Sequence, residues 1–219
     1  MKRSLLILAL GLLPLCAGAQ EPDTTRVVDL GLSVCWAGYN LGARAPQEYG
    51  DYYAWGETQT KAVYDLDTYK YCKGSYESLT KYCFQPEYGQ VDGLLELEPA
   101  DDAAYVCWGE GWRMPSREQL LELITRCKWR GIEYKGVNGF LITGPSGRSI
   151  FLPKAGGMDG AKKVLENNYG FYCSRSLDRL SSTAAEGTYV LAGVVNRRTG
   201  LLREYGRPVR AVWEGPSAP

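Results

Sequence analysis

The pattern of hydrophobic and polar positions changes along this chain, and each stretch predicts a different kind of structure. Residues 27–36 alternate loosely around Gly31 and Ser33, which predicts a strand, a turn and a second strand. Residues 37–99 keep no helical period and are rich in glycine, tyrosine, proline and acidic residues. We therefore expect long loops and short strands in this part, held together by aromatic side chains.

Two segments predict helices. Residues 99–106 place Asp101 and Asp102 in a first helical turn, where carboxylates favour the helix dipole. The same pair could be half of a calcium site, because hard cations bind clustered oxygens, but helix capping explains it more simply. Ser116 and Gln119 form the capping box of a second, amphipathic helix. Its apolar face is expected to comprise Leu120, Leu121, Leu123, Ile124 and Cys127.

From residue 132 onward the pattern favours strands. Residues 132–137 and 140–143 flank Asn138-Gly139, a dipeptide typical of a two-residue hairpin turn. Pro145-Ser146-Gly147 predicts the next turn. Further strands are expected at residues 149–152, 169–174, 188–195 and 208–213. Two helices followed by a meandering, mostly antiparallel sheet define a loop-rich α+β fold.

The first residues have the features of a secretory signal peptide. Lys2 and Arg3 precede an apolar run over residues 5–15, which is too short for a membrane-spanning helix. Ala17-Gly18-Ala19 supplies the small residues of a cleavage site, so we expect residues 1–19 to be removed. The alternative is a lipoprotein signal that ends at Cys16. The mature protein would be secreted or held at the cell surface or in the periplasm, with no membrane span.

The expected mature chain has one domain over residues 27–213. Short flexible ends are expected at residues 20–26 and 214–219. The whole chain has 25 Lys and Arg against 25 Asp and Glu, so we expect no overall basic surface for nucleic acid. The absence of histidine from the sequence excludes Ser-His-Asp triads, Cys-His dyads and histidine-ligated metals. We expect no metal, no cofactor and no enzymatic activity.

Six cysteines remain after removal of the signal peptide, and an even number in an exported chain favours disulfides. Cys72 and Cys83 are closest in sequence and flank a turn-rich stretch, so we expect them to be bonded to each other. Cys35, Cys107, Cys127 and Cys173 then allow three pairings, and the sequence does not choose among them.

Acidic and aromatic residues supply the remaining candidate chemistry. Glu57, Glu96 and Glu98 could provide paired carboxylates for glycoside hydrolysis, but their spacing singles out no pair. The six tryptophans are expected mainly in the core, whereas an exposed ring could stack on the apolar face of a sugar.

Several strings together resemble one known family. They include residues 28–37 (VDLGLSVCWA), 49–57 (YGDYYAWGE), 101–104 (DDAA), 112–116 (WRMPS), 136–140 (GVNGF), 150–153 (IFLP) and 207–210 (RPVR). Their order is similar to that of the Fibrobacter succinogenes major paralogous domain family, exported proteins that are common in Bacteroidetes-type bacteria. The chain departs from this family at Tyr39, Cys107 and Cys173, so a disulfide pattern cannot be transferred from relatives.

The resemblance implies a C-type-lectin-like domain that binds glycans or extracellular proteins and carries no catalytic residues. It also implies that the first and last strands lie side by side, with residues 27–30 near residues 209–213. The alternative is a structural or assembly component of the bacterial cell surface, and a hydrolase is the least supported class.

C-type-lectin-like domains bind ligands mainly through loops and late strands of their second half. In this chain that half offers a set of polar residues, five of them arginines, which predicts an acidic ligand such as a uronic or sialic sugar or an acidic protein patch. The candidate ligand-binding residues are Arg175, Asp178, Arg179, Asn196, Arg197, Arg198, Arg203 and Tyr205. The alternative interpretation is a solvated, charged rim.

Overall fold

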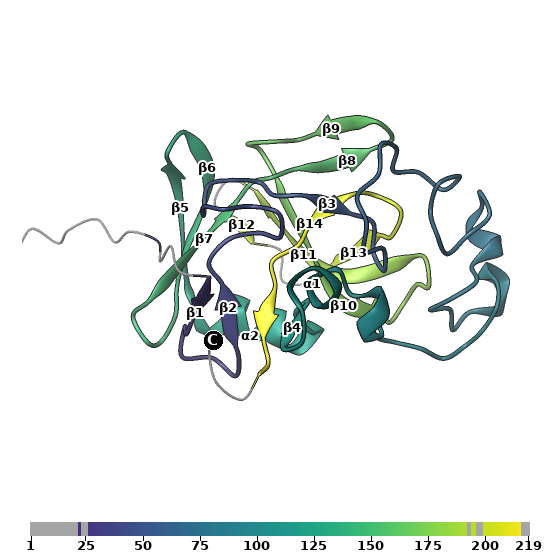
Figure 1. The fold of residues 1–219 in the computed structure, drawn as a ribbon, viewed down its shortest axis with the longest axis horizontal. Helices are drawn as coiled ribbons and strands as arrows, with labels where there is room; N and C mark the ends of the chain where they lie inside the picture. Colours follow the sequence, from purple (N-terminus) through teal and green to yellow (C-terminus); the bar gives the residue numbers. More distant parts are fainter. Residues whose placement is uncertain (1–21, 23–25, 192–193, 196–198, 216–219) are drawn as a thin grey trace, which may run out of the picture.

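Short antiparallel sheets and two α-helices make up the described part of the chain, which confirms the α+β prediction (Figure 1). The structure is a computed structural model, and it describes residues 22, 26–191, 194–195 and 199–215. The predicted signal peptide and its cleavage site lie outside these residues. The described part contains no helix that is both long and apolar enough to cross a bilayer.

The two ends of the domain meet in one four-stranded sheet with the order β1-β2-β15-β4. These strands are β1 (Val27–Val28), β2 (Cys35–Ala37), β15 (Val212–Trp213) and β4 (Trp112–Arg113). Val212 pairs with Trp36, and the amide of Ala37 donates to the carbonyl of Ala211 at 2.9 Å. The first and last strands therefore lie in the same sheet, as expected. They are not adjacent, however, because β2 lies between β1 and β15.

A second sheet packs on the longer helix. Its strands are β5 (Lys128–Tyr134), β6 (Val137–Thr143) and β7 (Ser149–Pro153), in that order. Phe140 and Ile142 of β6 and Ile150 of β7 form one apolar cluster with Leu120 and Leu123 of helix α2 (Arg117–Arg126). Burial of such side chains stabilises the fold by about 1.5–3 kcal/mol each. The Pro145-Ser146-Gly147 turn lies between β6 and β7, as predicted.

The turn between β5 and β6 lies three residues earlier than the sequence predicted. Tyr134 pairs with Val137, so Lys135 and Gly136 form the two-residue loop, with φ values of 49° and 81°. Both central residues of this kind of turn need positive φ, which glycine adopts at little cost. Asn138 and Gly139 belong to β6 instead.

Gly139 is required for close packing rather than for a turn. A Cβ at this position would lie 2.4 Å from Cζ of Phe151 and 2.6 Å from the carbonyl oxygen of Leu152. A Cβ at Gly136 would meet nothing within 4 Å. The two glycines therefore serve different purposes although only two residues separate them.

This difference gives a testable pair of variants. Gly139→Ala should lower the free energy of unfolding by about 1–3 kcal/mol through overpacking of a filled site. Gly136→Ala should cost only about 1 kcal/mol, from left-handed backbone strain. Urea unfolding of both variants provides the measurement. Equal destabilisation, or a greater effect at Gly136, would contradict the assigned register.

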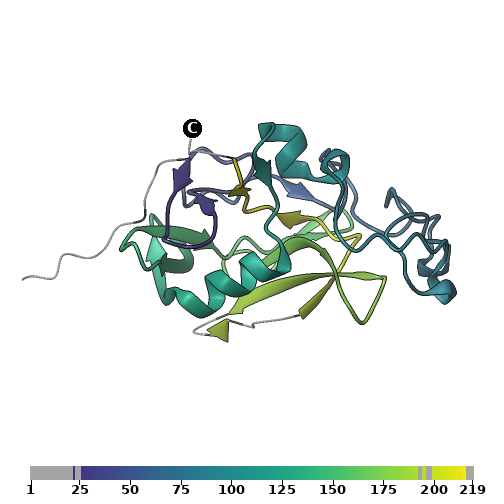
Figure 2. The same ribbon diagram turned by 90° about the horizontal axis from the view of Figure 1, so that it is seen from below.

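The predicted capping box is present. Helix α2 (Arg117–Arg126) begins after Ser116, whose hydroxyl accepts from the amide of Gln119 while the Gln119 side chain accepts from the amide of Ser116. The helix packs against strands β10 (Gly170–Leu177) and β11 (Ala184–Leu191) (Figure 2). Leu121 departs from the predicted apolar face, because it points to solvent with 42% of its surface exposed.

The acidic pair before the shorter helix acts through capping and ion pairing. Helix α1 (Ala103–Trp108) follows a 3₁₀ turn, η3 (Pro99–Asp101), and Asp102 is its N-cap. Asp101 forms ion pairs with Lys70 and Lys81. Burial alone would raise the pKa of Asp101, but hydrogen bonds from Lys81 and Tyr71 hold it well below its usual range. The capping interpretation is therefore confirmed for Asp102, whereas Asp101 lies before the helix and is held by ion pairs.

The remaining strands form small sheets around the centre. Strand β11 (Ala184–Leu191) pairs with β10 (Gly170–Leu177), β12 (Val194–Val195) and β13 (Thr199–Leu202). β3 (Tyr52–Tyr53) pairs with β14 (Arg207–Pro208), and β8 (Gly157–Asp159) pairs with β9 (Lys162–Val164). The strands predicted at residues 188–195 and 208–213 are thus each divided in two.

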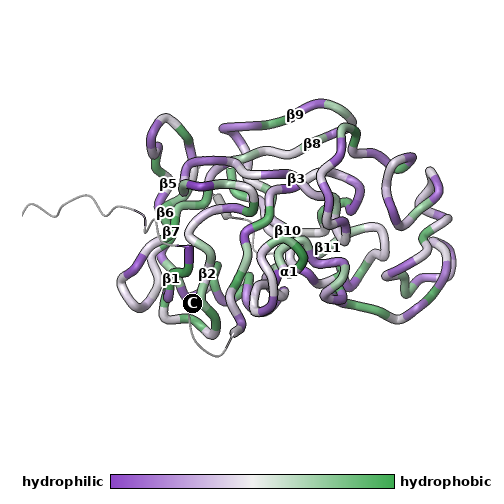
Figure 3. Tube along the Cα trace, in the orientation of Figure 1, coloured by the Kyte–Doolittle hydropathy of each residue, from purple (hydrophilic) through white to green (hydrophobic). Residues whose placement is uncertain are grey.

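The long loop region lies on the side of the molecule opposite β5, β6 and β7 (Figure 1). It contains the two-residue strand β3 and short 3₁₀ turns, including η1 (Tyr76–Ser78) and η2 (Pro86–Tyr88). Hydrophilic and hydrophobic residues alternate over short distances within it (Figure 3). Aromatic rings pack against one another within it: Trp55 contacts Tyr82, and Tyr71 contacts both Tyr69 and Tyr82, all edge to face. The expectation of loops held by aromatic packing is confirmed.

The predicted Cys72–Cys83 disulfide is not present in the structure. All six cysteines of the described part are free thiols. The Cys72 thiol donates to the carbonyl of Leu66 at 2.9 Å, and the Cys83 thiol donates to the carbonyl of Gln85 at 3.1 Å. Each sulfur is thus satisfied by its own local turn, and proximity in sequence was a poor guide to pairing.

Candidate functional site

The arginines predicted to bind an acidic ligand do not form one accessible surface. Arg175 is held by ion pairs with Glu96 at 3.2 Å and Glu214 at 2.8 Å. It also donates to the carbonyl of Met114. Its guanidinium therefore links strand β10 to three other segments, and its hydrogen-bonding capacity is used within the protein.

The next two predicted residues have different environments. Asp178 is buried and its Oδ1 accepts from the amides of Leu180 and Ser181, so it stabilises the turn after β10. Arg179 is exposed and lies 3.7 Å from Glu118, which is an ion pair at the surface. Among the described arginines of the predicted set, Arg179 is the one whose exposure fits the interpretation as part of a solvated rim.

Arg203 corrects the prediction most clearly, because only 1% of it is exposed. Its guanidinium donates to the carbonyls of Lys81, Tyr82 and Ser182 and to the hydroxyl of Tyr69. Arg203 therefore belongs to the core and cannot contact an external ligand. Three further predicted residues, Asn196, Arg197 and Arg198, lie outside the described residues.

Tyr205 is the predicted residue that leads to a candidate site. It lines an open hollow of about 380 Å³ together with four carboxylates. The hollow, which we call the acidic hollow, is lined by Tyr64, Asp65, Leu66, Asp67, Gly74, Asp159, Glu204 and Tyr205. Pockets of about 300–1,000 Å³ are typical of sites for small ligands. This space is large enough for one or two sugar rings.

Four separate segments build the acidic hollow. The loop that carries Tyr64 is joined to the turn after β8 by a pair of backbone hydrogen bonds between Tyr64 and Gly160, each 2.9 Å long. Asp159 is the last residue of β8, directly before that turn. Strand β8 is joined in turn to Gly206 by hydrogen bonds with Met158, which places Glu204 and Tyr205 beside the same hollow.

The most buried carboxylate of the acidic hollow is Glu204, with 5% of its surface exposed. Its Oε1 accepts a hydrogen bond of 2.6 Å from the hydroxyl of Tyr76. Its Oε2 is buried and has no hydrogen-bond partner among the described residues. A buried carboxylate oxygen without a partner is unusual, because nearly all such groups in native proteins are satisfied.

The other polar groups of the hollow are held in place. Asp65 accepts hydrogen bonds from the hydroxyl and the amide of Thr68, and these bonds lower its pKa. Burial, Asp159 and Glu204 raise the pKa of Tyr205, so its hydroxyl remains protonated. The guanidinium of Arg207 lies over the Tyr205 ring, 5.1 Å from its centre.

A second hollow lies beside the Tyr64–Gly160 bridge. It has a volume of about 270 Å³ and shares Tyr64 with the acidic hollow. Lys61 and Lys163 line it together with Asp51, so its charge is mixed. Lys61 is already paired with Glu57 at 2.9 Å. This second hollow therefore offers less unsatisfied charge than the acidic hollow does.

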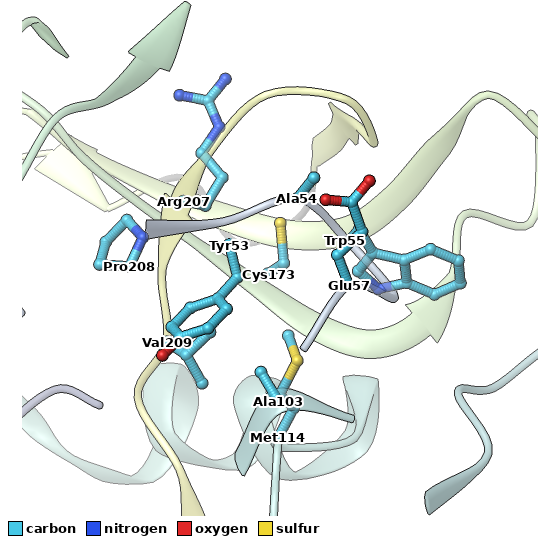
Figure 4. Close-up of a pocket in the computed structure, with 10 residues that line it drawn as sticks. All are labelled: Tyr53, Ala54, Trp55, Glu57, Ala103, Met114, Cys173, Arg207, Pro208 and Val209. Atoms are coloured by element: carbon cyan, nitrogen blue, oxygen red, sulfur yellow. The ribbon is translucent and has the colours of Figure 1, made fainter. Parts of the chain in front are cut away.

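A third space lies in the interior between β3, β10 and β14 (Figure 4). Its volume is only about 10 Å³, which is room for one water molecule at most. Figure 4 shows the guanidinium of Arg207 directed away from the other lining side chains. Burial raises the pKa of Cys173, which also lines this space, to about 11, so its thiol is not a nucleophile at neutral pH. The space is a packing gap.

The described residues contain no group of three or more Asp, Glu or Cys side chains that could hold a metal ion. The four carboxylates of the acidic hollow thus surround a space instead of converging on one point. Such an arrangement suits an organic ligand with several polar groups better than a single bare ion.

Comparisons with known proteins were made at the level of sequence and of fold. A scan of protein-family models, a search of curated proteins and a search of solved structures each find no match to this chain. The function therefore has to be inferred from the acidic hollow and from the sequence.

Sequence reasoning missed most of this site. Asp65-x-Asp67 was visible as a pair of acids, but its partners Asp159 and Glu204 are about ninety and one hundred and forty residues away. The late position of Tyr205 in the chain was the only signal that pointed to the correct place.

Proposed function

We propose that this protein is an exported, non-catalytic module that binds a glycan in the acidic hollow. The observation that carries the proposal is one open hollow in which four carboxylates surround a half-buried tyrosine ring. Sugar hydroxyls donate hydrogen bonds, and ionised carboxylates are acceptors only, so the two are complementary. The ring of Tyr205 and the side chain of Leu66 can contact the apolar face of a sugar.

The resemblance of the sequence and the class of fold support this proposal. The motifs of residues 28–57 and 101–116 resemble those of an exported family with a C-type-lectin-like domain. The closure of the N- and C-terminal strands into one sheet and the two helices are consistent with such a domain. The short apolar run after Lys2 and Arg3 supports export, with cleavage after Ala19.

Features of the structure argue against the two other classes. The exposed edge strand β5 carries Lys128, Arg130 and Glu133, and charged side chains discourage pairing of an edge with another chain. This counts against assembly through β5. Glycoside hydrolysis needs two carboxyl groups that flank one bond, whereas two of the candidates named from the sequence are held in ion pairs, Glu57 with Lys61 and Glu98 with Lys81.

A glycan array probed with residues 20–219 tests the proposal. We expect binding to a restricted set of glycans, and Tyr205→Ala should weaken it about tenfold because a stacking contact of about 1.4 kcal/mol is lost. Tyr189→Ala, which alters a half-buried tyrosine of β11 outside the hollow, is the matched control. No binding to any glycan by the folded protein, or full binding by Tyr205→Ala, would refute the proposal.

A further inference from the structure

Arg207 of strand β14 carries a guanidinium whose donors are not used within the described part of the protein. Its side chain forms no hydrogen bond and no ion pair there. The residue is partly exposed, and of its three nitrogens Nε alone is enclosed, so Nη1 and Nη2 are the ones that reach solvent. The guanidinium is directed away from the other side chains around the interior gap (Figure 4). The N–H donors of Nη1 and Nη2 are therefore open to an acceptor from outside the protein.

Aromatic rings flank this guanidinium. Its Cζ lies 4.4 Å from the centre of the Phe171 ring and 5.1 Å from the centre of the Tyr205 ring. The Phe171 ring is in turn parallel to that of Tyr169, with 5.7 Å between their centres. Strand β8 passes closely at Gly157, where a Cβ would lie 2.4 Å from Nη1. Contact with ring faces stabilises a guanidinium without using its N–H groups, so these donors stay available to a ligand.

Charges of both signs lie near Arg207. Burial lowers the pKa of Arg207, whereas the nearby carboxylates of Glu204 and Asp159 raise it. Asp159 is itself opposite Lys162 in the register of β8 and β9. A carboxylate on the ligand would be attracted by Arg207 but repelled by Glu204 and Asp159, and an ammonium group would meet the reverse. These surroundings favour a ligand without net charge.

We infer that Arg207 forms a second subsite, next to the acidic hollow, that donates hydrogen bonds to the hydroxyl oxygens of a neutral sugar. Tyr205 joins the two places, because it lines the hollow and its ring lies against the guanidinium. A sugar hydroxyl both donates and accepts, so one residue of a neutral chain can satisfy the carboxylates while the next satisfies Arg207. This inference rests on the proposed glycan-binding function and adds the ligand class, which is a neutral oligosaccharide of two or more residues. The class differs from the acidic ligand that the sequence predicted.

Oligosaccharide series of increasing length test the subsite. Residues 20–219 are titrated by calorimetry with neutral β-1,4-glucose, β-1,3-glucose and β-1,4-mannose oligomers, from the monomer to the tetramer. Series of α-1,4-galacturonic acid and β-1,4-glucosamine of the same lengths supply the charged comparisons. We expect a neutral series to bind most tightly, with a gain of at least about tenfold on lengthening, which is typical of added hydrogen bonds to a charged donor. Added salt should change this affinity little, because the ligand carries no charge.

Arg207→Met identifies the residue responsible. Methionine keeps an apolar side chain against Phe171, and circular dichroism checks the fold. We expect the variant to bind the monomer as the unmodified protein does and to lose the gain on lengthening, whereas a merely structural role would weaken every length equally. Arg207→Lys keeps the charge but not the planar fork, so it should recover only part of the gain. Arg179→Met removes an exposed arginine outside the subsite and should leave the gain unchanged.

The outcomes separate this inference from the function on which it rests. Affinity that does not depend on length, and that Tyr205→Ala abolishes, would overturn the second subsite and leave glycan binding in place. The same gain on lengthening in Arg207→Met as in the unmodified protein would overturn the role of Arg207. Tightest binding of the galacturonic acid or the glucosamine series would overturn the neutral ligand class. Absence of binding to every oligomer and to the glycan array by the folded protein would overturn the proposed function together with the inference.

Discussion

Replacement of Arg203 by methionine should lower the free energy of unfolding by about 3 kcal/mol or more, because several buried groups lose their partner. The guanidinium donates to three carbonyls and one hydroxyl, at distances of 2.8–3.0 Å. It also lies 4.9 Å from the centre of the Trp55 ring. Arg203 is thus the point at which strand β13, the aromatic cluster and the Ser182 turn are joined.

Opposing effects decide the size of this change. Removal of a buried charge recovers its desolvation free energy, and methionine fills part of the space. The carbonyls of Lys81, Tyr82 and Ser182 would each be left buried without a donor, at about 1–3 kcal/mol apiece. The loss therefore exceeds the gain.

Urea unfolding followed by tryptophan fluorescence measures this effect. Arg203→Lys should be almost as destabilising, because one ammonium group cannot reach four acceptors in a planar arrangement. Arg130→Met, at an exposed position of strand β5, is the control and should change stability by less than about 0.5 kcal/mol. An unfolding midpoint of Arg203→Met equal to that of the unmodified protein would contradict the assigned role.

Asp102→Ala should be similarly damaging, with a loss of about 4 kcal/mol. Asp102 is completely buried, and its two carboxylate oxygens accept from the amides of Ala104, Tyr105 and Met114. Its Oδ2 also accepts from Nε of Arg113 at 2.8 Å. Alanine would remove the cap of helix α1 and leave Arg113 without its counterion.

Thermal unfolding followed by circular dichroism tests this second prediction. Asp102→Asn keeps an acceptor for the helix amides but not the charge opposite Arg113, so its melting temperature should fall between those of Asp102→Ala and the unmodified protein. Glu110→Ala removes an exposed carboxylate shortly after the same helix and serves as the control. A melting temperature of Asp102→Ala within about a degree of that of the unmodified protein would refute the role assigned to Asp102.

Local signals in the sequence predicted local structure well. The capping box of Ser116 and Gln119 and the turn at residues 145–147 were found because each depends on residues within one turn of chain. The hairpin turn was misplaced because two glycines lie close together. The sequence does not show that Phe151 packs directly over Gly139, which leaves Gly136 for the turn.

Contacts between residues far apart in the chain could not be predicted from the sequence. An arginine is ordinarily exposed, and nothing near Arg203 in the chain reveals that residues 69, 81, 82 and 182 surround it. The acidic hollow is a similar case, since Asp67, Asp159 and Glu204 meet only after two bridges have formed between distant segments. Both the buried arginine and the hollow depend on tertiary packing rather than on a motif.

Mapping of amide chemical shifts in ¹⁵N-labelled residues 20–219 tests the central claim most directly. The protein is titrated with the glycan that binds most tightly on the array. The account predicts that the perturbed amides cluster at the acidic hollow, at Tyr64, Leu66, Gly74, Asp159 and Tyr205. Perturbations confined to the surface around Arg175 and Arg179, with none at these five positions, would contradict it.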